Sequence, residues 1–82
     1  MTNQSIKSSS MIYVDKILEV YTSDDDQRKA HIFQKVDAND IIHYGCRYYE
    51  KGVFMFDEFY PGKSLSWTES AALNWTIGVK NS

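Results

Sequence analysis

Three side chains in the sequence could act as soft metal ligands or catalytic groups: His31, His43 and Cys46. His43 and Cys46 are three positions apart, and on a strand this spacing turns them to opposite faces. The sequence has no CxxC or HxxxH spacing of the kind that zinc sites use. We therefore interpret the histidines as half-exposed residues and the thiol as a packed one, and we expect no metal.

Two polar stretches have the residue types of ligand-binding loops. Residues 61–64, Pro-Gly-Lys-Ser, match the end of a phosphate-binding P-loop, but the first glycine of that motif is missing. Asp24, Asp25 and Asp26 are consecutive, so their carboxylates splay apart instead of converging on one cation. We interpret both stretches as turns.

No other group of residues has the pattern of a catalytic site. Nucleophilic catalysis requires a nucleophile, a base and an orienting group within reach, and no serine lies in a recognisable motif of this kind. Asp57 and Glu58 are adjacent on a predicted strand and would point to opposite faces. We expect no catalytic residues, no cofactor and no enzymatic activity.

The composition indicates one small domain. A chain of 82 residues has a small core. The net charge of −2 argues against tight binding of nucleic-acid phosphates, which requires a concentrated basic surface. The single cysteine fits a reducing compartment, and no apolar run approaches the roughly 18 residues of a membrane span. We expect a cytoplasmic protein that does not contact membranes.

Alternation of apolar and polar residues, with many β-branched and aromatic side chains, is typical of strands. We predict strands at residues 11–22, 28–36, 41–49 and 53–60. Lys16 and Ile17 interrupt the first alternation, which indicates a bulge. Residues 23–27 and 37–40 have the Ser and Asp content of turns, and Gly52 suits a tight hairpin connection.

One helix is predicted near the C-terminus, from about residue 67 to residue 79. Ser66 and Glu69 have the spacing of a capping box, in which each side chain satisfies a free backbone N–H of the other residue. Ala71 and Ala72 would let the helix approach a sheet closely. Leu73 and Ile77 lie off that face and stack on each other as an i, i+4 pair.

The predicted fold is α+β: a four-stranded antiparallel β-meander with one C-terminal helix packed on one face, in the order β-β-β-β-α. Residues 1–10 are expected to be a disordered tail and residues 11–82 a single domain. A short helix beginning within residues 37–44 is the alternative. The expected buried residues are Leu18, Val20, Ile32, Ile42, Phe56, Ala71, Ala72 and Trp75.

Two surfaces are candidates for binding a partner. One is the pair Leu73 and Ile77 on the outer side of the helix. The other is the sheet face that the helix leaves open, where rings and an arginine could stack on bases or bury against a protein. Its predicted members are Tyr13, Phe33, His43, Arg47 and Tyr49.

Two partial resemblances to known families involve the C-terminal segment. Residues 59–75, "FYPGKSLSWTESAALNW", are similar in outline to the end of a double-stranded-RNA-binding domain, although the lysines that start the helix in that family are absent here. The segments "KILEVYT", "GKSLSWTESAALNW" and "IGVK", with the tyrosine-rich hairpin, resemble small uncharacterised bacteriophage proteins of the cyanophage type. The second resemblance implies an accessory protein in the cytoplasm of an infected host, with no known activity.

These observations lead to one functional hypothesis and one alternative. We expect a small non-enzymatic protein-interaction module, which forms a homodimer or binds a host protein. The alternative is a nucleic-acid-binding domain that uses the aromatic face of the sheet, although the acidic balance of the chain counts against it.

Overall fold

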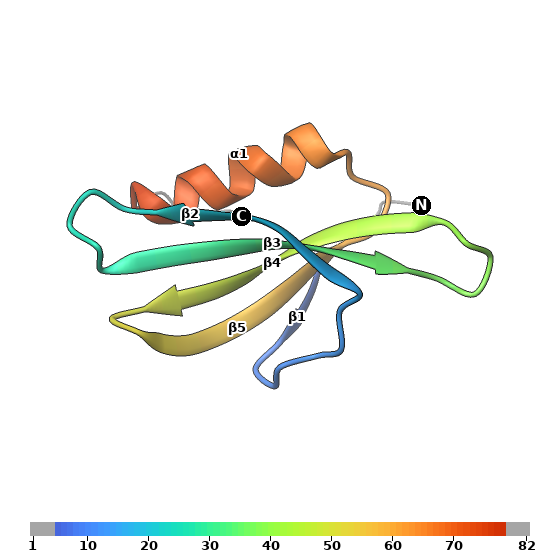
Figure 1. Cartoon of the computed structure of the whole chain (residues 1–82), viewed down its shortest axis with the longest axis horizontal. Helices are drawn as coiled ribbons and strands as arrows, with labels where there is room; N and C mark the ends of the chain where they lie inside the picture. Colours follow the sequence, from blue (N-terminus) through green and yellow to red (C-terminus); the bar gives the residue numbers. More distant parts are fainter. Residues whose placement is uncertain (1–4, 79–82) are drawn as a thin grey trace.

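The computed structural model describes residues 5–78 and shows one antiparallel sheet covered on one face by a helix (Figure 1). The strands are β1 (Ile6–Ser8), β2 (Lys16–Thr22), β3 (Arg28–Val36), β4 (Ile42–Glu50) and β5 (Val53–Tyr60), and the helix is α1 (Leu65–Thr76). The spatial order is β1-β5-β4-β3-β2, and all four pairings are antiparallel. The α+β class and the helix-covered antiparallel sheet are confirmed, but the sheet has five strands, not four.

The fifth strand, β1, corrects the prediction that residues 1–10 form a disordered tail. Ile6, Lys7 and Ser8 pair with Phe59, Glu58 and Asp57 of β5. Residues 1–4 lie outside the described part of the chain. A strand of three residues is too short to show alternation, and its partner lies about fifty positions away. Local sequence therefore carries no signal for it.

The turns between the strands follow their predicted chemistry. At the β4–β5 hairpin, Lys51 and Gly52 have φ values of 53° and 78°, as in a type I′ turn. Residues 37–41 form a turn instead of the alternative short helix, because Asp37 Oδ1 accepts hydrogen bonds from the backbone N–H groups of Asn39 (2.8 Å) and Ile41 (3.0 Å). The predicted bounds of the strands 28–36 and 53–60 are confirmed.

The first predicted strand, residues 11–22, is wrong over its first part, because β2 begins only at Lys16. The predicted bulge is present, as a register shift between Ile17 and Glu19 opposite β3. This extra residue reverses the alternation, so Val20 pairs with His31 on the face away from the helix and is 53% exposed. The prediction that Val20 is buried is therefore also wrong.

The helix begins two residues earlier than predicted. The N-cap is Ser64, whose Oγ accepts a hydrogen bond of 3.0 Å from the backbone N–H of Trp67, so Ser66 lies inside the first turn and makes no capping box with Glu69. A tight turn leads from β5 directly to this cap: Gly62 has a φ of 80°, and the backbone N–H of Lys63 donates a hydrogen bond of 3.2 Å to the carbonyl oxygen of Tyr60. The helix ends at Thr76, and the predicted end at residue 79 lies outside the described residues.

The main core lies between α1 and the sheet. Tyr48 is fully buried at its centre, with its ring centroid 4.9 Å from that of Trp75 and 5.0 Å from that of Phe56. The fully or almost fully buried members of this core are Ala30, Ile32, Cys46, Tyr48, Tyr60, Ala71 and Ala72, and its partly buried members are Leu18, Tyr21, Phe56 and Trp75.

Ile42 corrects the predicted core at one further position, because its side chain is exposed. It pairs with Val36 at the end of the β3–β4 hairpin, which extends past the start of the helix (Figure 1). The helix therefore does not cover it. Within residues 5–78, no helix is long and apolar enough to cross a membrane.

Candidate functional site

The sheet face away from the helix carries most of the predicted partner-binding residues. The β3–β4 register sets His31 opposite Arg47, Phe33 opposite Gly45 and Lys35 opposite His43. Directly paired residues share a face, so Phe33, His43, Arg47 and Tyr49 lie on the same side of the sheet. Their predicted common face is therefore present.

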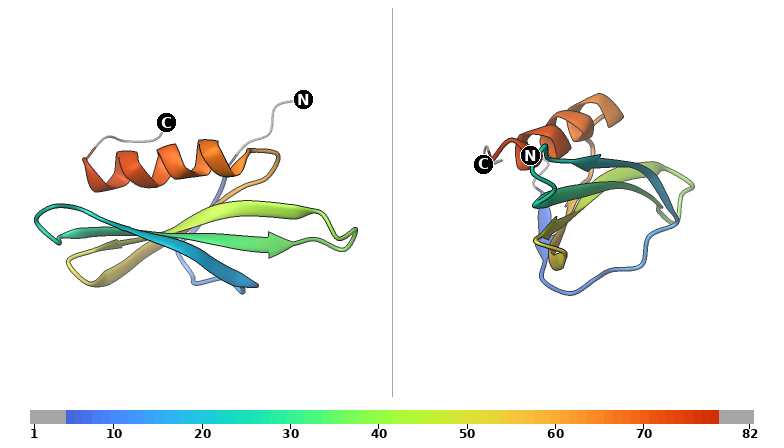
Figure 2. Two further views of the ribbon diagram at one scale, coloured as in Figure 1. Left: turned by 45° about the horizontal axis from the view of Figure 1, so that its top comes forward. Right: turned by 60° about the vertical axis from the view of Figure 1, so that its left-hand side comes forward.

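This face is not open, because the segment between β1 and β2 crosses it. The two strands lie at opposite edges of the sheet, and the connection passes on the side away from α1 (Figure 2, right). Asp57 Oδ2 accepts a hydrogen bond of 2.8 Å from the backbone N–H of Ile12, and Arg47 Nη2 donates one of 2.7 Å to the carbonyl oxygen of Ile12. The crossing segment thus covers the centre of the second face.

The guanidinium group of Arg47 forms a buried ion pair with Asp57. Its Nε donates to Asp57 Oδ1 at 2.8 Å and its Nη2 to Asp57 Oδ2 at 3.1 Å, in a two-pronged ion pair. Arg47 is 9% exposed and Asp57 is 1% exposed. The guanidinium is therefore not available to a phosphate or a partner protein, which corrects the prediction that Arg47 is a contact residue.

Phe33 is also a core residue and not a contact residue. Its ring is fully buried over Gly45, and a Cβ atom added at Gly45 would overlap that ring. Phe59 stacks beside it, with ring centroids 6.4 Å apart. Phe33 therefore belongs to a second, smaller core under the crossing segment.

The other three predicted residues of this face each have a different neighbour within the protein. Tyr13 lies exposed on the crossing segment, where Lys35 Nζ approaches its ring at 5.4 Å. His43 Nε2 lies 2.9 Å from Asp37 Oδ2. Tyr49 packs against His31, with ring centroids 4.7 Å apart.

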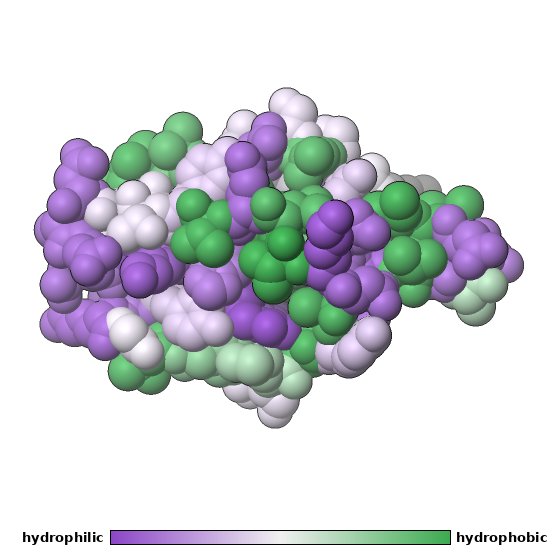
Figure 3. All heavy atoms as spheres, viewed as in Figure 1, coloured by the Kyte–Doolittle hydropathy of each residue, from purple (hydrophilic) through white to green (hydrophobic). Residues whose placement is uncertain are grey.

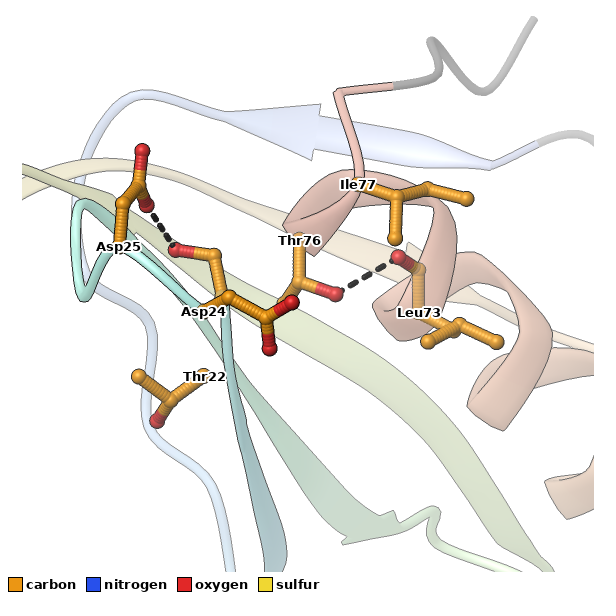
Figure 4. Close-up of a pocket in the computed structure, with 7 residues that line it drawn as sticks. Thr22, Asp24, Asp25, Leu73, Thr76 and Ile77 are labelled. Carbon is orange, nitrogen blue, oxygen red and sulfur yellow. Dashed lines mark hydrogen bonds between the residues drawn. The ribbon is translucent and has the colours of Figure 1, made fainter.

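The second predicted surface lies exposed at the C-terminal end of α1, where Leu73 is in the last turn and Ile77 is the C-cap residue. Leu73 is 49% exposed and Ile77 is 64% exposed. Beside them is a groove of about 460 Å³, whose other wall is the turn between β2 and β3 (Figure 4). We call it the helix–turn groove, and its lining residues are Thr22, Ser23, Asp24, Asp25, Leu73, Thr76 and Ile77. Helical phase predicts the apolar pair, but only the fold brings the acidic turn, some fifty residues earlier, next to it.

The helix–turn groove has one apolar wall and one acidic wall. Asp25 Oδ1 accepts hydrogen bonds from Ser23 Oγ (2.7 Å) and from the backbone N–H of Gln27 (3.1 Å), and these bonds lower the pKa of Asp25. The helix also ends here, and its C-terminal carbonyls carry partial negative charge. In the space-filling view, hydrophilic residues gather at the end of the molecule that holds this turn (Figure 3).

The buried polar groups under the helix do not form a reactive site. Burial raises the pKa of the Cys46 thiol to about 12, so the thiol is protonated near neutral pH. Burial likewise raises the pKa values of Tyr48 and Tyr60, whose hydroxyl groups contact each other. Among the described residues, no group of three or more His, Cys, Asp or Glu side chains could hold a metal ion.

Comparisons with protein-family models, with curated proteins and with solved structures found no match for this chain. Both resemblances drawn from the sequence therefore stay predictions.

Proposed function

We propose that this protein is a non-enzymatic protein-interaction module that uses Leu73, Ile77 and the helix–turn groove as its contact surface. The observation that carries the proposal is the exposure of two large apolar side chains, 49% and 64%, one turn apart on a helix beside a groove. Amphipathic helices and apolar grooves of this kind are common modes of protein recognition.

The domain does not need Leu73 and Ile77 for its own core. The opposite side of α1 supplies Thr68, Ala71 and Ala72, which are buried against the sheet. Full burial of a Leu or Ile side chain stabilises by about 1.5–3 kcal/mol, so a partner that covers both half-exposed residues would gain roughly 2–3 kcal/mol. That gain is enough to make these two residues the centre of a modest interface.

The absence of an enzymatic role is part of the proposal. The thiol and the buried tyrosine hydroxyls lie under the helix and are held in their neutral forms. We also propose that the protein acts in the cytoplasm, and in that of an infected host if the bacteriophage resemblance holds.

The nucleic-acid alternative has less support. It needs Arg47 and Phe33 at the surface of the second face, and both are buried beneath the crossing segment. Base stacking requires exposed rings, and phosphate binding requires free cations. We therefore do not carry this alternative forward.

The test compares the wild type with the double variant Leu73→Glu/Ile77→Glu. Sedimentation at several concentrations measures self-association, and affinity capture measures the binding of other proteins. The matched control is Val53→Glu/Met55→Glu, because Val53 and Met55 are also exposed apolar residues but lie on β5.

We expect the helix variant to lose self-association or the captured protein while the β5 variant keeps it. Circular dichroism should show all three proteins folded. Equal behaviour of the wild type and the helix variant in both assays would contradict the proposal.

A further inference from the structure

Strand β2 is a free sheet edge that lies directly beside the proposed contact surface. It is the outermost strand, seven residues long, and nothing within residues 5–78 pairs with its outer side (Figures 1 and 2). The opposite edge is different, because β1 covers part of β5. An unpaired edge of this length can add a strand from another chain.

The hydrogen-bonding groups of this edge can be placed from the β2–β3 ladder. The backbone N–H of Ser23 donates to the carbonyl oxygen of Arg28 at 2.9 Å, so Ser23 points toward β3. Successive residues of an antiparallel strand alternate in direction. The backbone N–H and C=O groups of Thr22 and Val20 therefore point outward, toward an incoming strand.

Both layers of the domain are apolar along this edge. On the sheet face away from the helix, Ile17 and Val20 are exposed. On the helix side, Leu73 and Ile77 lie above the end of β2, across the helix–turn groove from Thr22 (Figure 4). A strand added to β2 would cover apolar side chains in both layers at once.

We propose that a second copy of this chain docks antiparallel on β2, with Val20 beside Val20 of the partner subunit. The proposal rests on the function proposed above and names its partner. The pairing is two-fold symmetric, so every contact occurs twice. It joins two five-stranded sheets into one and brings the two helix–turn grooves into the interface.

The side chains on either side of the centre favour this register. It sets Glu19 opposite Tyr21 of the partner subunit, and both residues lie in the regular part of β2 that follows the bulge between Ile17 and Glu19. Tyr21 already donates a hydrogen bond to a glutamate, its own Glu19, at 3.4 Å. A register centred on Glu19 would instead place two carboxylates opposite each other, which is unfavourable.

Neighbouring registers have a second disadvantage. One centred on Thr22 would set Glu19 opposite Asp25 of the partner subunit, again with like charges facing. It would also separate the two Val20 side chains. The Val20 register combines outward hydrogen-bonding groups, an apolar centre and a pairing of Glu19 with Tyr21 on each side of that centre.

The first experiment is disulfide trapping of the full chain. In a hydrogen-bonded antiparallel pair the Cα atoms are about 5.5 Å apart, within the range of a disulfide. We expect Val20→Cys to give a covalent dimer on mild oxidation. The matched control is Thr22→Cys, which lies on the same face of β2 but two positions from the two-fold axis, so its two copies are too far apart for a disulfide and should stay monomeric on a non-reducing gel. The natural cysteine, Cys46, is buried and does not compete.

The second experiment measures the dimer without a covalent bond. Val20→Lys would place two ammonium groups side by side at the centre of the interface, and we expect the dimer to be lost at concentrations where the wild type is dimeric. The control is Val53→Lys, which changes a similarly exposed valine on β5 and should leave the dimer intact.

The outcomes separate this inference from the proposed function. A dimer that Leu73→Glu/Ile77→Glu abolishes, but that Val20→Lys leaves intact and Val20→Cys does not trap, would overturn docking on β2 and leave the proposed function standing. A strict monomer at all concentrations would overturn the second copy as the occupant. The proposed function would then fall only if the helix variant also captured the same proteins as the wild type.

Discussion

Arg47 and Asp57 form an ion pair beneath the segment that crosses the second face of the sheet. The two residues sit on neighbouring strands, β4 and β5, and are directly paired in the register. Asp57 also accepts the backbone N–H of Ile12, and Arg47 donates to the carbonyl oxygen of the same residue. One buried pair thus joins two strands to the crossing segment and allows β1 and β2 to lie at opposite edges.

We predict that Asp57→Asn destabilises the protein by about 3–5 kcal/mol, because it leaves the Arg47 charge buried and uncompensated. Chemical denaturation measures the change in the free energy of unfolding. The control is Glu50→Gln, which breaks the partly exposed pair between Glu50 and Arg28 at 4.0 Å and should cost less than about 1 kcal/mol. Equal effects of the two substitutions would show that the buried pair has no special role.

Gly45→Ala should destabilise the protein by about 1–3 kcal/mol through overpacking. The new Cβ would overlap the ring of Phe33 and lie 2.5 Å from the carbonyl oxygen of Glu58, and the latter is backbone that cannot rotate away. Gly52→Ala is the control: its φ of 78° costs roughly 1 kcal/mol for any other residue, but the space around it is open. Thermal unfolding of both variants shows which substitution causes the larger loss of stability. A smaller loss at Gly45 than at Gly52 would contradict the close packing of Phe33.

The helix cap can be tested with two serines that differ only in position. Ser64→Ala should cost about 1 kcal/mol of stability, because it removes the acceptor of the Trp67 N–H. Ser66→Ala lies in the first turn of the helix and should change stability by no more than about 0.5 kcal/mol. A larger loss of stability in Ser66→Ala than in Ser64→Ala would show that Ser66 is the N-cap.

Acid should weaken the turn at residues 37–41. The hydrogen bond from His43, followed by those from the backbone N–H groups of Ile41 and Asn39, lowers the pKa of Asp37 below its ordinary value of 3.8. A carboxyl group whose pKa is lowered on folding stabilises the protein above the unfolded pKa, and this stabilisation is lost as the pH falls through the folded pKa. We therefore expect the wild type to lose stability below about pH 4.

The measurement is the unfolding midpoint between pH 5 and pH 2 in the wild type and in Asp37→Asn. The variant should be less stable at pH 5 and should lose less of its remaining stability on acidification. Asp40→Asn, in the same turn, controls for the loss of one negative charge. Parallel pH profiles of the wild type and Asp37→Asn would refute the role of Asp37.

The two candidate surfaces differ in how far the sequence could predict them. The exposure of Leu73 and Ile77 follows from helical phase alone, since the opposite side of the helix carries the alanines that approach the sheet. The common face of Phe33, Arg47 and Tyr49 follows from strand alternation. Alternation says which residues share a face, but it does not say what covers that face.

Local sequence determined the strands at 28–36 and 53–60, the turns at residues 37–41 and 51–52, and the C-terminal helix. The reason is that alternation and turn chemistry depend on neighbouring residues. Tertiary structure alone decided four features. They are strand β1, the outward turn of Val20 after the bulge, the burial of Arg47 and Phe33, and the meeting of the acidic turn with the helix. Three of these depend on contacts between residues far apart in the chain. The fourth, the orientation of the Val20 side chain, depends on where the single extra residue of the bulge falls against β3. All four features are decided only when the whole sheet and its helix pack together.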